Sequence, residues 1–288
     1  MADVDPIVIV GCARTPMGGF LGDFKDTAAA VLGAAAIRSA VKRAGIAAGD
    51  VEEVIMGCVL PAGQGQAPAR QAAIGAGLPL SAGATTVNKM CGSGMKALMQ
   101  AHDSILAGNA RVAVAGGMES MSNAPYLLDR ARAGYRMGHG AVHDHMFLDG
   151  LEDAFDKGRL MGTFAEDCAE SYQFTRKAQD DYALASLSRA LAAANSGRFD
   201  WEITPVAVKG RDGRAYGLRA TGSVLTFDGF LKVYDEGRDD RLRTIDKGKD
   251  DLEGEDDASR RLPPLSAGDR LVDREISADQ HFTQPPPR

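Results

Sequence analysis

The sequence predicts an α/β layered fold built on a mainly parallel, mixed sheet. Three observations predict it: short apolar runs recur along the chain, segments with helical periodicity separate them, and glycine marks many of the junctions. Strands that alternate with helices in this way pair largely in parallel. With 288 residues, 44% of them hydrophobic, the chain is long enough to bury at least one full core, and its length fits one or two domains.

The first elements can be placed in order from the N-terminus. Pro6 to Gly11 is a continuous apolar run, which is typical of a strand buried on both faces of a sheet. A helix is expected from about Thr27 to Ala44, closed by Gly45 in the C′ position. Val51 to Val59 predicts a second strand, and the glycine loop that begins at Gly63 leads into a helix that ends before Pro79.

The next strand and helix flank Cys91. Residues 83–88 are rich in β-branched side chains and predict a strand. Residues 93–106 predict a helix, and residues 111–117 predict a further strand. The helical prediction rests on larger side chains that recur at a spacing of three and four, namely Met95, Leu98, Met99, His102, Ile105 and Leu106.

The pattern loosens from Met118 to about Gly162, where methionine, glycine and histidine are frequent and periodicity is weak. A segment of this length without regular elements is usually a functional excursion, such as a lid over a site. Helical periodicity returns over 163–172 and 175–195, and Trp201 to Val208 predicts a strand.

Cys91 is the candidate nucleophile of this chain. It falls on a tight turn from strand to helix, and Gly92 and Gly94 leave the backbone bare around it. The unpaired N–H groups and the positive dipole end of a helix stabilise a thiolate. Free cysteine is also among the most buried residue types, so this segment alone leaves a packing role open.

Composition excludes several classes of function. The net charge of −6 and the pI of about 5.4 disfavour a basic nucleic-acid binder. No stretch approaches the ~20 apolar residues of a membrane span, and the acidic N-terminus does not read as a secretory signal. The four cysteines lack CxxC pairing, which disfavours a zinc site and a disulfide framework and fits the cytoplasm. Cys12, Cys58 and Cys168 are interpreted as packing residues.

Two further motifs are weighed and set aside. Gly11, Gly18 and Gly19 do not have the G-x-G-x-x-G spacing of a dinucleotide-binding loop. His139, His143 and His145 could chelate a metal if they lay on one helix, but the glycines among them disfavour that helix. No metal site is predicted.

Several segments together resemble the thiolase family, the coenzyme A dependent acetyltransferases and ketoacyl thiolases. The resemblance runs from about Ile7 to Gly213 and is specific because the segments keep their order and spacing. It rests on Cys12-Ala13-Arg14-Thr15-Pro16, Gly18-Gly19-Phe20, the loop from Gly63 to Pro79, Asn88-Lys89-Met90-Cys91-Gly92-Ser93-Gly94, Gly116-Gly117-Met118-Glu119-Ser120-Met121-Ser122, and Met161-Gly162-Thr163-Phe164-Ala165-Glu166.

The resemblance implies a reaction and its residues. Cys91 would attack a CoA thioester such as acetoacetyl-CoA or a 3-ketoacyl-CoA and pass the acyl group to coenzyme A or acetyl-CoA, with no permanently bound cofactor. The 118–162 segment would be the lid that lines the pantetheine channel. Leu151 and Met161 would contact substrate, while Leu160 stands where some members carry histidine. A homo-oligomer is expected.

The resemblance implies an N-terminal thiolase half, residues 1–213, followed by a different segment. Residues 214–288 hold 16 Asp and Glu and 13 Lys and Arg, and form an irregular or β-rich tail by prediction. The tail resembles an internal piece of bacterial type IA DNA topoisomerase over Tyr216 to Tyr234, Arg260 to Pro263 and Gln280 to Arg288, without that enzyme's metal-binding or strand-cleaving motifs.

Three functional hypotheses follow from this division. The first is an acyltransferase of thiolase type. The second is a catalytically incompetent half-thiolase, fused at about 211–214, because the histidine and cysteine motifs of the family's second half do not occur. His281 is the only histidine after Arg214, and no cysteine follows Cys168. The third and weakest is a nucleic-acid-binding tail, since the tail has more acidic than basic residues.

Overall fold

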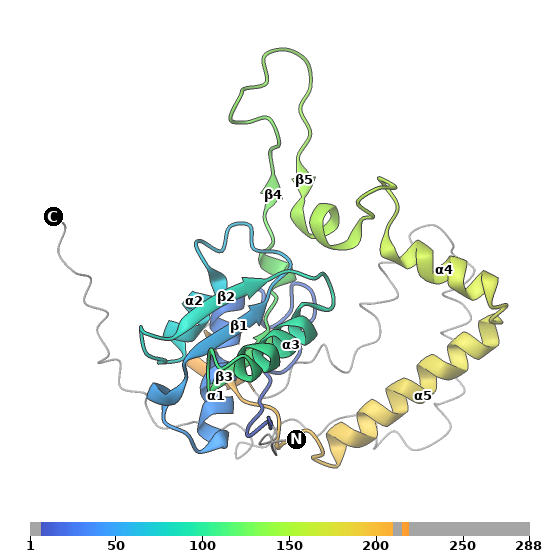
Figure 1. Cartoon of the computed structure of the whole chain (residues 1–288). Coiled ribbons are helices and arrows are strands. Elements are labelled where there is room, and N and C mark those ends of the chain that lie inside the picture. Colours follow the sequence, from blue (N-terminus) through green and yellow to red (C-terminus); the bar gives the residue numbers. More distant parts are fainter. Residues whose placement is uncertain (1–6, 210–214, 219–288) are drawn as a thin grey trace. The chain divides into compact units, whose positions relative to one another are not determined.

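The computed structural model describes residues 7–209 and 215–218 (Figure 1). Described residues up to Val206 form one compact unit, and those from 207 onward belong to a second. In the second unit lies β7 (Ala215–Leu218), which pairs with β6 (Val206–Lys209) in a two-stranded sheet. The topoisomerase-like segments lie outside the described residues apart from positions 216–218.

A three-stranded parallel sheet organises the first unit. Its order is β2 (Gly83–Val87), β1 (Glu53–Gly57) and β3 (Ala113–Gly117), with β1 in the middle (Figure 1). Gly57 at the end of β1 is in register with Val87 on one side and with Gly117 on the other. The carboxyl ends of all three strands therefore meet at one edge, and the predicted parallel α/β architecture is confirmed.

Helices cover both faces of this sheet. On one face, Val54 and Met56 pack with α1 (Ala29–Ala44) and α2 (Pro68–Gly75). On the other face, Ile55 packs with α3 (Ser93–Leu106). Because successive strand residues point to opposite faces, the apolar run of residues 54–56 in β1 serves both layers.

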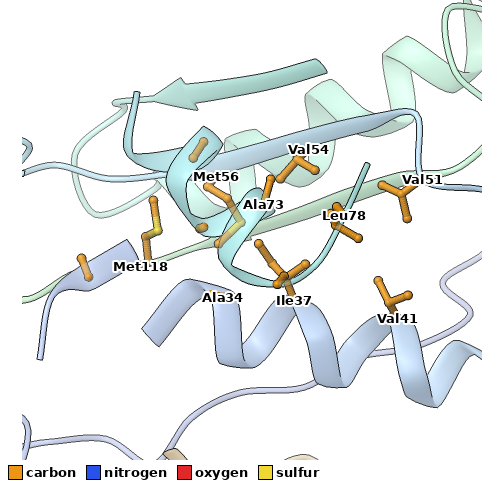
Figure 2. Close-up of a cluster of buried hydrophobic side chains, with 13 residues drawn as sticks. Ala34, Ile37, Val41, Val51, Val54, Met56, Ala73, Leu78 and Met118 are labelled. Atoms are coloured by element: carbon orange, nitrogen blue, oxygen red, sulfur yellow. The ribbon is translucent and has the colours of Figure 1, made fainter. Parts of the chain in front are cut away.

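The larger core lies among α1, α2 and β1. Figure 2 shows Ile37 of α1 next to Ala73 of α2, and Val41 pointing toward Leu78 and Val51 in the neighbouring loops. Each such aliphatic side chain contributes about 1.5–3 kcal/mol when fully buried, so this cluster holds the layer together. Gly45 ends α1 in the left-handed conformation, with φ +70°, and its N–H donates to the Lys42 carbonyl as the sequence predicts.

The strand predicted at residues 6–11 is absent where the structure describes it. Residues 7–11 form no strand, and the side chains of Val8, Ile9 and Val10 are 65%, 73% and 60% exposed. An apolar run is compatible with a strand, but a strand also needs a pairing partner, which local sequence does not specify. The strand predicted from Trp201 likewise begins only at Val206, although Ile203 makes one bridge to Arg14.

The 118–162 segment is irregular, as predicted. It contains a short 3₁₀ turn, η2 (Met121–Asn123), a two-residue pair of strands, β4 (Tyr126–Leu127) and β5 (His143–Asp144), and a π-helical turn, η3 (Phe147–Leu151). The two predicted helices after it are α4 (Met161–Ser171) and α5 (Arg176–Asn195), neither of which has a buried residue. A further 3₁₀ turn, η1 (Ala48–Asp50), precedes β1.

Candidate active site at the start of helix α3

Cys91 lies on the turn between β2 and α3, two residues before the helix begins. It is exposed, whereas Ser93 behind it is buried. The sequence prediction of a cysteine at a strand-to-helix turn is thus confirmed in its position. The packing alternative for Cys91 is wrong, because the side chain is not enclosed.

The turn is held by side-chain hydrogen bonds on both sides of the cysteine. The Ser93 hydroxyl accepts from the Lys89 N–H at 2.8 Å and donates to the Met90 carbonyl at 2.6 Å. The Asn88 side-chain carbonyl accepts from the Met90 N–H at 3.0 Å. These contacts stabilise Met90 at φ +48°, a backbone conformation that costs energy for a side chain of this size.

The helix start is seated directly on the end of β1. A Cβ at Gly57 would lie 2.6 Å from the Ser93 carbonyl carbon and 2.7 Å from the Gly94 nitrogen, so only glycine permits this approach. Gly94 also lies against the backbone of Gly116 and Gly117. The small residues of the motif therefore bring the first turn of α3 to the carboxyl edge of the sheet.

Two backbone donors remain available at this helix start. Over the described residues, the N–H groups of Gly94 and Met95 donate to no carbonyl, while the Ser93 N–H donates to Met90 and the Lys96 N–H donates to Gly92. Free amides at a helix N-terminus carry partial positive charge and attract anions. They favour a thiolate, or an oxygen that becomes negative, beside Cys91.

A shallow cavity of about 340 Å³ adjoins the cysteine. Its lining comes from the ends of β1 and β3 and from the α3 turn: Gly57, Val59, Met90, Cys91, Ser93, Gly94, Gly117, Met118 and Glu119. This space is open to a thioester carbonyl, and Cys91 is the only nucleophilic sulfur in its wall. Cys58, one residue before Val59, is instead 1% exposed.

Glu119 is a site residue for which sequence reasoning assigned no role. Its carboxylate accepts from the N–H groups of Val59 at 2.8 Å and Leu60 at 3.1 Å, and from the Cys58 thiol at 3.5 Å. Burial raises the pKa of Cys58 to about 11, and the nearby Glu119 carboxylate adds to the effect. The signal in the sequence was a single carboxylate two residues after a strand, within the quoted Gly116 to Ser122 motif.

The lid region is attached to the loop after β1 through His145. The side chain is 4% exposed, its Nδ1 lies 2.6 Å from the Asp149 carboxylate, and its Nε2 accepts from the Ala62 N–H at 3.4 Å. The acceptor role of Nε2 places the proton on Nδ1, where it donates to Asp149. This histidine therefore fastens η3 to the wall of the cavity.

The predicted substrate contacts lie at the two ends of the lid's last loop. Leu151 ends η3 and is half-buried, whereas Met161 begins α4 and is 43% exposed. Neither lines the cavity next to Cys91. Leu160, which precedes α4, forms an isolated bridge with Glu152 that closes this loop.

The remaining cysteines and histidines that the structure describes do not gather into a site. Cys58 is buried, as predicted for a packing residue, but Cys12 and Cys168 are exposed, so that interpretation was wrong for both. Residue type alone does not predict that Cys12 in its loop and Cys168 on the solvated helix α4 are exposed. Within residues 7–209 and 215–218, no three His, Cys, Asp or Glu side chains lie close enough to hold a metal ion. None of the helices that the structure describes is long and apolar enough to cross a bilayer.

Comparison with known families decides the ancestry of this arrangement. Residues 7–223 match the family described as "Thiolase, N-terminal domain". The chain belongs to the thiolase family. The match extends ten residues beyond Gly213, where the sequence resemblance was placed, and includes the whole cysteine turn and the lid.

Individual thiolase-family relatives agree with this assignment. The chain is 56% identical over 209 residues to acetyl-CoA acetyltransferase 2 of Arabidopsis thaliana, covering 72% of this chain and 51% of the relative. It is 51% identical over 212 residues to acetyl-CoA acetyltransferase of Pseudomonas aeruginosa, covering 74% and 54%. It is 48% identical over 210 residues to mitochondrial acetyl-CoA acetyltransferase of Mus musculus, covering 72% and 49%. The chain spans about half the length of these curated relatives.

Proposed function

We propose that this chain carries out thiolase-type acyl transfer through Cys91. From acetyl-CoA, the sulfur attacks the thioester carbonyl carbon, a new S–C bond forms, the bond to the CoA sulfur breaks, and coenzyme A leaves with the proton of the thiol. From acetoacetyl-CoA, the sulfur attacks the 3-keto carbon, the C2–C3 bond breaks, and acetyl-CoA leaves with that proton on C2. The free N–H groups at the start of α3 are proposed to stabilise the negative charge that develops on the carbonyl oxygen during the attack. The observation that carries the proposal is an exposed cysteine beside a cavity at a helix N-terminus.

The substrates follow from the relatives' names. Acetyl-CoA and acetoacetyl-CoA are the proposed acyl donors, with coenzyme A or acetyl-CoA as the acceptor, and no cofactor is held permanently. Leu151 and Met161 are proposed to contact the substrate as the lid covers it. We further propose that the chain forms a homo-oligomer and acts in the cytoplasm. Its relatives include one form named cytosolic and one named mitochondrial.

A second proposal concerns how far the reaction proceeds. Among the described residues that line the cavity there is no histidine, and the Glu119 carboxylate already accepts from two amides and a thiol. A positioned general base typically contributes about 10²- to 10⁴-fold to a rate. These observations favour a chain that is acylated once at Cys91 and turns over slowly. The tail beyond residue 214 is proposed to be a fused topoisomerase-like segment without a role in this reaction.

The experiment incubates the chain with acetyl-CoA, removes the protein by filtration and quantifies free coenzyme A by chromatography, because acyl transfer between two thiols leaves the total of free thiols unchanged. Acylation of Cys91 releases one equivalent of coenzyme A per chain, and this burst is absent from Cys91→Ala. A continuing steady release, or thiolysis of acetoacetyl-CoA, identifies a competent acyltransferase. A burst without further release identifies the half-thiolase. No burst from the folded wild-type chain would contradict both.

A further inference from the structure

Glu119 lies at the centre of the hydrogen bonds behind the cavity. Each carboxylate oxygen accepts from a different backbone amide: Oε2 from Val59 at 2.8 Å and Oε1 from Leu60 at 3.1 Å. Oε1 also accepts from the Cys58 thiol. Hydrogen bonds to a charged acceptor are stronger than neutral ones. The carboxylate after β3 therefore fixes the backbone that leaves β1.

This fixed backbone is connected to the cysteine turn. The carbonyl of Val59 accepts from the Asn88 side-chain amide at 3.3 Å, and the Asn88 carbonyl oxygen accepts from the Met90 N–H at 3.0 Å. Met90 is the residue held at φ +48° directly before Cys91. Four hydrogen-bonding groups thus form one continuous path from the Glu119 carboxylate to the neighbour of the reacting sulfur.

We propose that Glu119 is a positioning residue for Cys91, acting through Val59 and Asn88. Its carboxylate accepts from Val59, Leu60 and Cys58 rather than from Cys91, and it works by keeping the turn in its strained conformation. The inference rests on the proposed function only in taking Cys91 as the reacting group. This role requires the two acceptor oxygens of a carboxylate at position 119, and not only a side chain of this size.

The two-acceptor geometry distinguishes glutamate from its isosteric amide. In Glu119→Gln, one oxygen becomes an NH₂ group that faces the N–H of Val59 or Leu60, so one amide loses its acceptor. Glu119→Asp keeps both acceptor oxygens but is one methylene shorter. If Glu119 acts only through its size, Glu119→Gln should keep more of the Cys91 reactivity than Glu119→Asp. If it acts through its two acceptor oxygens, Glu119→Asp should keep more than Glu119→Gln.

The test measures the alkylation of Cys91 by iodoacetamide relative to Cys168 in the same full-length molecule, by peptide mass spectrometry. Cys168 is exposed and outside the cavity, so it corrects for reagent and global stability. Glu53→Gln is the matched control, because Glu53 begins β1 and its carboxylate accepts from Ser104 near the far end of α3. Asn88→Ala breaks the same path at an exposed residue and serves if Glu119→Gln fails to fold.

The expected ratio of Cys91 to Cys168 alkylation falls by about threefold or more in Glu119→Gln and in Asn88→Ala, the factor expected for losing one modest hydrogen bond. Glu119→Asp retains more of the ratio than Glu119→Gln, and Glu53→Gln equals wild type. The proposal is overturned if the alkylation ratio in Glu119→Gln and Asn88→Ala equals that of the wild type. It is also overturned if Glu119→Gln has a higher alkylation ratio than Glu119→Asp. Failure of acetyl-CoA to acylate the wild-type chain would count against the proposed function alone, because alkylation still reports on the turn.

Discussion

Gly57 and Ser93 touch through their backbones where β1 ends and α3 begins. A Cβ at position 57 would lie 2.6 Å from both the carbonyl carbon and the Cβ of Ser93. Non-bonded carbon atoms are most stable at about 3.5–4.0 Å, so the contact excludes any side chain at position 57. The height of α3 above the sheet, and with it the position of Cys91, is set by a glycine on a different element.

Gly57→Ala should displace the start of α3 and destabilise the fold. We expect a loss of about 1–3 kcal/mol in the free energy of unfolding, the usual cost of overpacking, together with slower alkylation of Cys91 relative to Cys168. Urea unfolding and peptide mass spectrometry measure the two effects. Gly83→Ala is the control, because a Cβ there meets only the Glu52 carbonyl oxygen, at 3.9 Å. Equal stabilities of the two variants would contradict this account of the contact.

Much of this fold could be predicted from local sequence, because apolar periodicity marks its strands and helices and a glycine ends α1. The predicted bounds of α3 are those observed, and Gly45 closes α1 as expected. The exposed faces were harder to predict. Met95, Leu98 and Met99 recur at helical spacing, yet they are 66%, 49% and 57% exposed, while the small Ala97 and Ala101 make the buried face.

The candidate site was predictable in part. The turn at Cys91 follows from a β-branched strand, a glycine-rich turn and a periodic helix, which succeed one another directly between residues 83 and 106. Glu119 and Gly57 come to the same place only because three parallel strands end at one edge of the sheet, which is a long-range property. The exposure of Val8 to Val10 has the same kind of cause, since strand pairing is decided by distant residues.

His145→Ala should release the lid from the loop after β1. The change leaves the Ala62 N–H without its acceptor and the Asp149 carboxylate without its donor, at a cost of about 1 kcal/mol, because both hydrogen bonds are only partly buried. Hydrogen exchange at Ala62 and over residues 143–151 should become faster. The exposed His139→Ala is the control. Unchanged exchange over 143–151 would show that other contacts fasten the lid.

Cys58 should make the chain less stable in alkaline solution. Its pKa is raised to about 11 in the folded chain, mainly by burial, from an ordinary value of 9.0. The unfolded chain therefore releases this proton first, so the thiol's stabilising contribution is complete below about pH 9 and is lost as the pH rises through about 11. The full effect of two pKa units is about 2–3 kcal/mol.

The measurement compares urea unfolding of the wild type and Cys58→Ala at about pH 8 and about pH 10.5, a window that spans this titration. Other groups titrate in both proteins, so only the difference between them reports on Cys58. The difference between the free energies of unfolding of the wild type and Cys58→Ala should be smaller at the higher pH. A gap that is the same at both values would contradict a buried, protonated thiol behind the cavity.

The central claim is that the sulfur of Cys91, and no other in this chain, takes the acyl group of a CoA thioester. The most direct test is to incubate the full chain with acetyl-CoA and locate the acetyl group by peptide mass spectrometry. The account predicts acetyl on Cys91 and none on the equally exposed Cys12 and Cys168. An unmodified Cys91, or acetyl shared equally among the three exposed cysteines, would contradict it.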